Sequence, residues 1–144
     1  MKIYMDNCCF NRPFDDQGQV KIKIETEAVL YIQQKLIEEK IDLVWSYILD
    51  YENNFNPFPE RRISIESWKE YSQIDIKESN ELLNYAKELF ESGIKAKDAL
   101  HIASAVTANC EYFLTTDEDI IKKLINYKKI KIINPAELII KENV

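Results

Sequence analysis

The chain has 144 residues and a net charge of -6, from 19 basic and 25 acidic side chains. This length predicts a single domain over residues 1–144 with a substantial core. Its only two glycines, Gly18 and Gly93, exclude a glycine-rich phosphate loop, and no apolar run approaches the roughly 20 residues of a membrane span. We therefore expect a cytoplasmic protein with no membrane partner.

Hydrophobic periodicity predicts strands and helices in alternation. A short strand at 2–6 ends on Asp6, the polar stretch NCCFNRPFDDQG follows as a loop, and apolar steps of three and four residues predict a helix over 21–40. The apolar run 41–46 is a second strand. It ends on Ser46, a residue type that caps helices, and the next helix should stop before Pro57.

The second half of the chain continues this alternation. Helices are predicted over 60–72, 76–92 and about 96–109, with Gly93 ending the second of them. A strand over 111–116 reaches Asp117, a helix follows over 118–126, a strand over 129–133, and Pro135 opens a last helix. This order predicts an α/β fold with a small parallel sheet of about four strands and helices on its faces.

Four acidic residues stand out by their places in this pattern. Asp6 and Asp117 follow predicted strands, Glu52 lies on the helix after Ser46, and Asp98 lies near the start of the alanine-rich helix. Ligands of such sheets bind beyond the carboxyl ends of the strands, where these residues could meet. Gathered carboxylates repel one another unless a cation lies among them, and oxygen donors favour Mg²⁺ or Mn²⁺. Taken singly, each of the four also fits an ordinary turn, helix-start or surface role.

Four segments resemble the PIN-domain family of metal-dependent ribonucleases, which includes the VapC-type toxins. They are IYMDNC, WSYILDYE, KDALHIASA and YFLTTDEDI, and their order and spacing fit over nearly the whole chain. The resemblance implies a three-layer α/β/α fold and a catalytic pocket of Asp6, Glu52, Asp98 and Asp117. It also implies Asp119 as a metal ligand beside Asp6, Asp98 and Asp117.

The implied activity is hydrolysis of phosphodiester bonds in single-stranded or structured RNA, leaving 5′-phosphate and 3′-hydroxyl ends. Mg²⁺ or Mn²⁺ would be the cofactor. The resemblance further implies a type II toxin–antitoxin toxin, with an antitoxin protein as partner and a homodimer as the assembly. Thr115 or Thr116 would orient a carboxylate or a water molecule, and Asn7 would help to position substrate.

The chain has only three arginines, Arg12, Arg61 and Arg62. Because a guanidinium donates hydrogen bonds in pairs to phosphate, we predict that they bind the RNA backbone. The alternative is that they neutralise nearby acids, namely Asp15, Asp16 and Glu60. The single histidine, His101, follows Asp98 by one helical turn, and we interpret it as a buried, hydrogen-bonded residue, with a role at the pocket edge left open.

Two other functions remain open at this point. A catalytically inactive PIN-like module would bind RNA or protein without cleaving, although it would have no need to keep four acids. A small Mg²⁺-dependent phosphatase would use the same type of sheet. The sequence disfavours the phosphatase, because Asp6 is followed by Asn7 and Cys8 and not by the second acid of a DxD motif.

Overall fold

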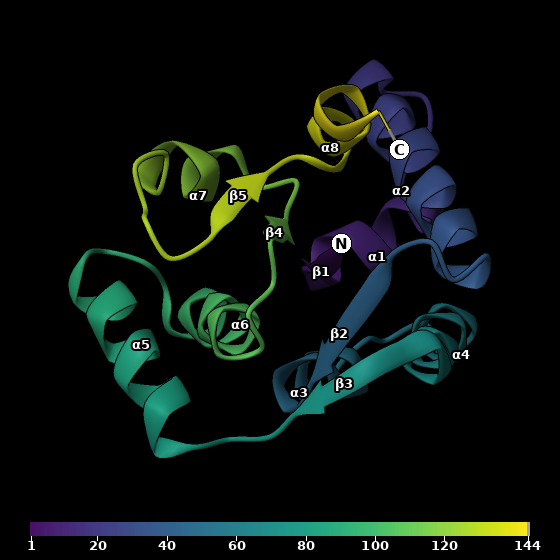
Figure 1. Ribbon diagram of the computed structural model, residues 1–144. Helices are drawn as coiled ribbons and strands as arrows, with labels where there is room; N and C mark the ends of the chain where they lie inside the picture. The colour runs from purple at the N-terminus through teal and green to yellow at the C-terminus, as the bar shows by residue number, and fades with distance from the viewer. Residues whose placement is uncertain (144) are drawn as a thin grey trace.

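A five-stranded parallel sheet forms the centre of the molecule (Figure 1). The computed structural model describes residues 1–143. The strand order is β3-β2-β1-β4-β5, and every neighbouring pair is parallel. Parallel neighbours require a crossover connection, which agrees with the helices between the strands. The strands are β1 (Lys2–Met5), β2 (Asp42–Ser46), β3 (Ser72–Ile76), β4 (Tyr112–Leu114) and β5 (Lys131–Ile133).

Helices cover both faces of the sheet and give the molecule three layers. The pair α5 and α6 lies on one side, and the pair α2 and α8 lies on the other (Figure 1). The helices are α1 (Asn7–Asn11), α2 (Val20–Ile37), α3 (Tyr47–Asn54), α4 (Pro59–Ser67), α5 (Asn80–Glu91), α6 (Ala96–Thr107), α7 (Glu118–Lys123) and α8 (Pro135–Glu142). Two 3-10 turns, η1 (Arg12–Phe14) and η2 (Trp68–Tyr71), follow α1 and α4.

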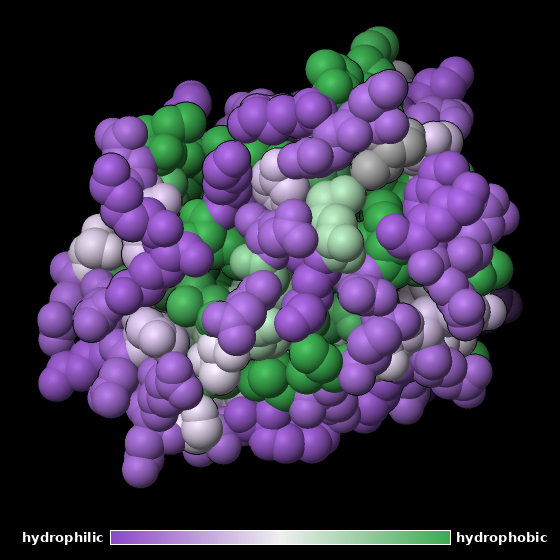
Figure 2. All heavy atoms as spheres, viewed as in Figure 1, coloured by the Kyte–Doolittle hydropathy of each residue, from purple (hydrophilic) through white to green (hydrophobic). Residues whose placement is uncertain are grey.

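The central strands are apolar because helices bury both of their faces. Consecutive residues of β1 and β2 are fully buried, among them Ile3, Tyr4, Val44 and Trp45. Such continuous burial is typical of parallel strands with helices on either side. The face of the molecule seen in Figure 2 is mostly hydrophilic, with its hydrophobic side chains in small patches. No helix among residues 1–143 combines the length and apolar character that crossing a bilayer requires.

The predicted three-layer α/β/α fold is confirmed, with one strand more than expected. Residues 72–76 form the edge strand β3, where the sequence predicted the end of one helix and the start of another at 76. The segment alternates apolar and polar residues for only five positions, which is too short to separate a strand from a helix end. Helix α5 begins later than predicted, at Asn80, because the Ser79 hydroxyl accepts a hydrogen bond from the Leu82 amide and caps it.

Residues 7–14, the first part of the predicted loop, are helical, whereas residues 15–18 lie outside any helix. The Asp6 carboxylate accepts a hydrogen bond from the Asn7 backbone N–H at 2.8 Å and caps α1, and η1 follows at once. Helix α1 could not be recognised in the sequence, because the stretch is mostly polar and has no repeat of apolar residues at helical spacing. The predicted cap at Ser46 is confirmed, since its Oγ accepts from the Leu49 N–H at 3.3 Å.

Candidate metal centre

The candidate site lies at the carboxyl edge of the sheet, where several elements begin or end. Asp6 directly follows β1, and Asp117 follows β4 after two threonines. Glu52 lies on α3, the helix that continues from β2, and Asp98 lies in the first turn of α6. Because the strands are parallel, their carboxyl ends share one edge, and this topology brings the four segments together.

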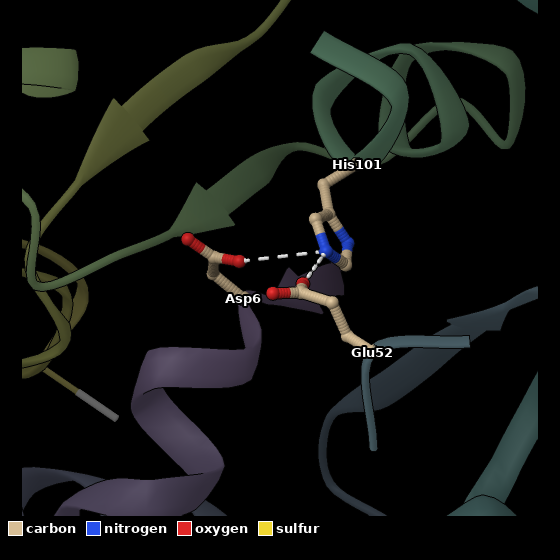
Figure 3. Close-up of side chains that lie close together, drawn as sticks. All are labelled: Asp6, Glu52 and His101. Atoms are coloured by element: carbon tan, nitrogen blue, oxygen red, sulfur yellow. Dashed lines mark hydrogen bonds and ion pairs between the residues drawn. The ribbon is translucent and has the colours of Figure 1, made fainter. Parts of the chain in front are cut away.

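Asp6, Glu52 and His101 form the tightest cluster at this edge. One ligand atom from each lies within 4.8 Å of the others, and the three side chains point toward one another from β1, α3 and α6 (Figure 3). His101 Nε2 is hydrogen-bonded to Glu52 Oε1 and lies 3.9 Å from Asp6 Oδ1. Two carboxylates at this separation fit a divalent cation, because a cation would offset their like charge.

Thr115 connects the carboxylate of Asp6 to the start of α7. Its hydroxyl donates to Asp6 Oδ2 at 3.0 Å and accepts from the Asp117 backbone N–H at 3.2 Å. The side chain is fully buried, so both bonds are shielded from water. The thiol of Cys8 lies 3.5 Å from the same Asp6 oxygen. Thr115 therefore holds the Asp6 carboxylate in place, and the predicted role of Thr115 or Thr116 toward a metal or substrate stays a prediction.

Asp98, Asp117 and Asp119 line a small hollow beside this cluster. Its volume is about 70 Å³, and Lys95 and Lys123 also line it. Asp117 Oδ1 caps α7 by accepting the N–H of Asp119 at 2.9 Å and that of Ile120 at 3.3 Å. One carboxylate oxygen of Asp117 is thereby held by the backbone.

The pKa of Asp98, in the hollow, depends on the charges of the acids in the neighbouring cluster. Burial raises the pKa of Asp98, and the charge of Asp6 raises it further, as do Asp117 and Glu52. The ionised form of Asp98 is therefore disfavoured by all three of the other acids, which means that the four predicted site acids lie within one electrostatic neighbourhood.

Glu52 differs from Asp98 because it has a direct partner. Burial by itself would raise the pKa of Glu52, but the hydrogen bond from His101, together with the charge of Lys97, lowers it below its ordinary value. The carboxylate form of Glu52 is therefore favoured even without a cation. The candidate site thus contains one acid, Glu52, whose charged form is favoured and one, Asp98, whose charged form is disfavoured.

Each predicted RNA-binding arginine already has a partner in the protein. Arg12, the first residue of η1, pairs with Asp15 and with Glu25 on α2 at 2.9 Å each. Arg61 lies 3.5 Å from Asp15, and Arg62 donates to a backbone carbonyl of the loop before α4. These contacts match the alternative of local neutralisation for Arg12 and Arg61. Contact of the three arginines with RNA stays a prediction.

The remaining predicted substrate residues lie beside the cluster. Asn7 directly follows Asp6, and its Oδ1 is buried without a hydrogen-bond partner among the described residues. Thr116 is also buried, and its backbone N–H donates to Cys8 Sγ at 3.4 Å. The positions suit contact with a ligand at this edge, and their roles toward substrate stay predictions.

The sequence analysis did not predict the partners of His101, which bonds Glu52 through Nε2 and Tyr4 through Nδ1. Tyr4 Oη lies 2.6 Å from His101 Nδ1 and 2.6 Å from Ser46 Oγ, and all three side chains are fully buried. The available signal was a tyrosine in an otherwise apolar strand and a lone histidine one turn after Asp98. Neither feature names its partner, because these contacts span 42 and 97 residues of sequence.

Comparisons with protein-family models and with curated proteins find no match to this chain. Solved structures do match. A chain of VapBC2 from Rickettsia felis, bound to a DNA fragment from the promoter, aligns with a TM-score of 0.61 and 15% identity over 93% of this chain and 98% of that one. A chain of VapBC-1 from nontypeable Haemophilus influenzae aligns with a TM-score of 0.63 and 14% identity over 94% and 98%. Each match spans the arrangement of strands and helices almost completely.

Proposed function

From the premise that the chain has the PIN-domain fold of the VapC proteins, we propose that it is a metal-dependent endoribonuclease acting on single-stranded RNA. The observation that carries the proposal is the meeting of acids from separate segments at one edge of the sheet. Asp6, Glu52 and Asp117 each raise the pKa of Asp98 by their charge. Acids that only stabilise the fold have no reason to lie close enough to repel one another, whereas acids that share a cation must lie that close.

The residues present fit a hard divalent cation. Asp6, Glu52, Asp98 and Asp117 would hold Mg²⁺ or Mn²⁺ through oxygen atoms, with Asp119 as a further ligand. When bound, such an ion lowers the pKa of a coordinated water and stabilises negative charge on the phosphate group.

The chain itself supplies the orientation of these acids. Thr115 holds Asp6 by a hydrogen bond, and two backbone N–H groups of α7 hold Asp117. Lys95 and Lys123, which line the hollow with Asp98, carry the positive charge that would attract an RNA phosphate.

Cleavage of labelled single-stranded RNA tests the proposal. We expect products with Mg²⁺ or Mn²⁺, none with EDTA, and a loss of rate of at least about 10-fold for Asp98→Asn. Asp42→Asn is the matched control, since Asp42 is an exposed aspartate at the opposite end of β2 and should leave the rate unchanged. Cleavage that persists in EDTA, or in Asp98→Asn, would rule out the proposed chemistry. RNA binding without cleavage would favour the inactive module.

We also propose an antitoxin protein as partner and a homodimer as the assembly, because the matching chains come from VapBC structures. Exposed aromatic side chains offer an apolar surface for such a partner: Tyr51 of α3 packs against Phe55, and Arg61 lies over the rings of Phe14 and Phe58. Expression of the chain alone should arrest bacterial growth, and co-expression of a small neighbouring gene should relieve the arrest. Light scattering of the purified chain tests the dimer, and a monomer mass would exclude it.

A further inference from the structure

A continuous chain of hydrogen bonds runs through the protein interior and ends at the candidate metal centre. The Leu49 backbone N–H lies 3.3 Å from Ser46 Oγ, which lies 2.6 Å from Tyr4 Oη. Tyr4 Oη lies 2.6 Å from His101 Nδ1, and His101 Nε2 is hydrogen-bonded to Glu52 Oε1 (Figure 3 shows this last contact). The chain links β1, β2 and α6 and both begins and ends on α3.

The two ends of this chain fix its direction. A backbone N–H can only donate, so Ser46 Oγ accepts from Leu49. A carboxylate can only accept, so His101 Nε2 carries the hydrogen that points at Glu52. In the neutral ring Nδ1 then accepts, so the Tyr4 hydroxyl donates to it. The Tyr4 oxygen is left to accept the hydroxyl hydrogen of Ser46, and every donor in the chain meets an acceptor.

Other proton arrangements leave a buried group without a partner. If Nδ1 carried a hydrogen, Tyr4 would have to donate to Ser46, whose own hydroxyl hydrogen would then have no acceptor among the contacts described. Ser46 is fully buried, so water cannot replace that acceptor. A neutral ring with its hydrogen on Nδ1 would also set the Nε2 lone pair against the Glu52 carboxylate. Only the neutral Nε2–H form satisfies the whole chain.

We propose that His101 is a positioning residue that holds the Glu52 carboxylate at the centre, with Tyr4 and Ser46 fixing its ring, and that it is not a ligand of the cation. The proximity of His101 to Asp6 and Glu52 suggests a mixed nitrogen and oxygen site. Both ring nitrogens, however, are engaged within the protein, so neither has a free lone pair to offer. This leaves a centre of oxygen donors. The inference rests on the proposed function only for the presence of the cation.

Nitrogen NMR of the metal-free protein tests the proton arrangement directly. The chain contains one histidine, so its ring nitrogen signals need no assignment by mutation. We expect a protonated Nε2 and an unprotonated Nδ1 at neutral pH, and the same pattern after Mg²⁺ is added. A hydrogen on Nδ1, or loss of the Nε2 hydrogen on adding Mg²⁺, would overturn the proposal. This readout decides it even for a protein that cleaves no RNA.

Mn²⁺ binding separates a positioning role from ligation. His101→Gln keeps an N–H donor for Glu52, so the Mn²⁺ dissociation constant should stay within about 3-fold of wild type. His101→Leu and Tyr4→Phe should each weaken binding by about 10-fold, as loss of a ligand's supporting contact does. Tyr112→Phe is the control, since that hydroxyl bonds Glu142 on α8 and should have no effect.

Pulsed electron paramagnetic resonance of bound Mn²⁺ adds a spectroscopic signature. We expect no directly coordinated nitrogen in the wild-type spectrum. A coordinated nitrogen that disappears in His101→Gln, with equal losses of affinity for the Gln and Leu variants, would show that His101 is a ligand and would refute the positioning role.

Discussion

Asp98 is a single residue that should lower the stability of the metal-free fold while contributing a ligand to the proposed cation. Its pKa is raised in the folded chain by burial and by the charge of Asp6, so its ionised form is less favourable there than in the unfolded chain. Asp98→Asn should therefore raise the free energy of unfolding of the metal-free protein at neutral pH. The gain should shrink as pH falls through the raised pKa and disappear below the ordinary aspartate value of about 3.9. Urea denaturation in EDTA between neutral pH and pH 3 measures this change.

A control separates charge repulsion from the preference of helix starts for acids. Glu60 lies in the first turn of α4, as Asp98 lies in the first turn of α6. Glu60→Gln should lower stability slightly, by about 0.3–1 kcal/mol or less, because it removes a favourable helix-dipole interaction. Equal losses for both variants would mean that the other acids do not repel Asp98. Added Mg²⁺ should stabilise wild type more than Asp98→Asn.

Thr115 offers a second prediction at this scale. Its hydroxyl bonds both the buried carboxylate of Asp6 and the N–H of Asp117, so its removal takes one hydrogen bond from each of them. Thr115→Val should cost about 1–3 kcal/mol of stability and weaken Mn²⁺ binding, as measured by denaturation and calorimetry. Thr107→Val is the matched control, because the Thr107 hydroxyl oxygen is buried without a partner and its loss should be neutral or stabilising. Similar losses in both variants would contradict the bridging role.

Among the elements, the edge strand β3 pairs irregularly with β2, and the side chain of Gln73 compensates for this irregularity. The pairing of β2 with β3 shifts register between Leu43 and Val44, so that Gln73 has no opposite residue. Its side-chain Oε1 accepts the Leu43 backbone N–H at 2.7 Å in place of a strand carbonyl. Gln73→Leu should therefore cost about 1–3 kcal/mol in a denaturation experiment. Gln73→Glu keeps an acceptor oxygen and should retain most of the stability, and a neutral Gln73→Leu would disprove this assignment.

The elements that the sequence predicted well are those with several turns or with strong caps. The helix over residues 20–37 has enough apolar steps to define a face, and Ser46 marks the start of α3 by residue type. Strand β3 was not predicted, because five residues at a sheet edge carry little periodicity. Helix α1 was not predicted either, because its start depends on the carboxylate of Asp6, which the sequence analysis treated as a metal ligand or an ordinary turn acid and did not connect to a helix over the residues that follow.

For the whole molecule, the net charge of -6 predicts that the proposed binding of RNA depends on divalent ions. A negatively charged protein repels phosphate, and a cation among the carboxylates reverses the local sign. We expect a non-cleavable RNA to bind in Mg²⁺ at least about 10-fold more tightly than in EDTA at equal ionic strength. Fluorescence anisotropy measures this ratio. An affinity that does not change would place the RNA on a surface away from the acids.

The general position of the candidate site could be predicted from the sequence, but the hydrogen-bond partners of its side chains could not. Acids that follow parallel strands must meet at one edge, so Asp6 and Asp117 could be placed from the element order alone. The partners of His101 depend on how α6 packs over β1 and β2, which no local pattern encodes. The arginines show the same limit in part. Asp15, which pairs with Arg12 and Arg61, could be named from the sequence, whereas the second partner of Arg12, Glu25, depends on the packing of η1 against α2.

The buried chain through Tyr4, Ser46 and His101 restricts how this protein can diverge. Replacing any one of the three by an apolar residue leaves a buried hydroxyl or ring nitrogen without a partner, whereas replacing all of them together leaves only the two end groups, the Leu49 N–H and the Glu52 carboxylate, without theirs. Natural relatives of this chain should therefore keep the trio intact or lose it as a set. Sequences that retain a tyrosine at position 4 but lack the histidine at 101 should carry another acceptor for the tyrosine hydroxyl nearby. A survey of homologous sequences can test this.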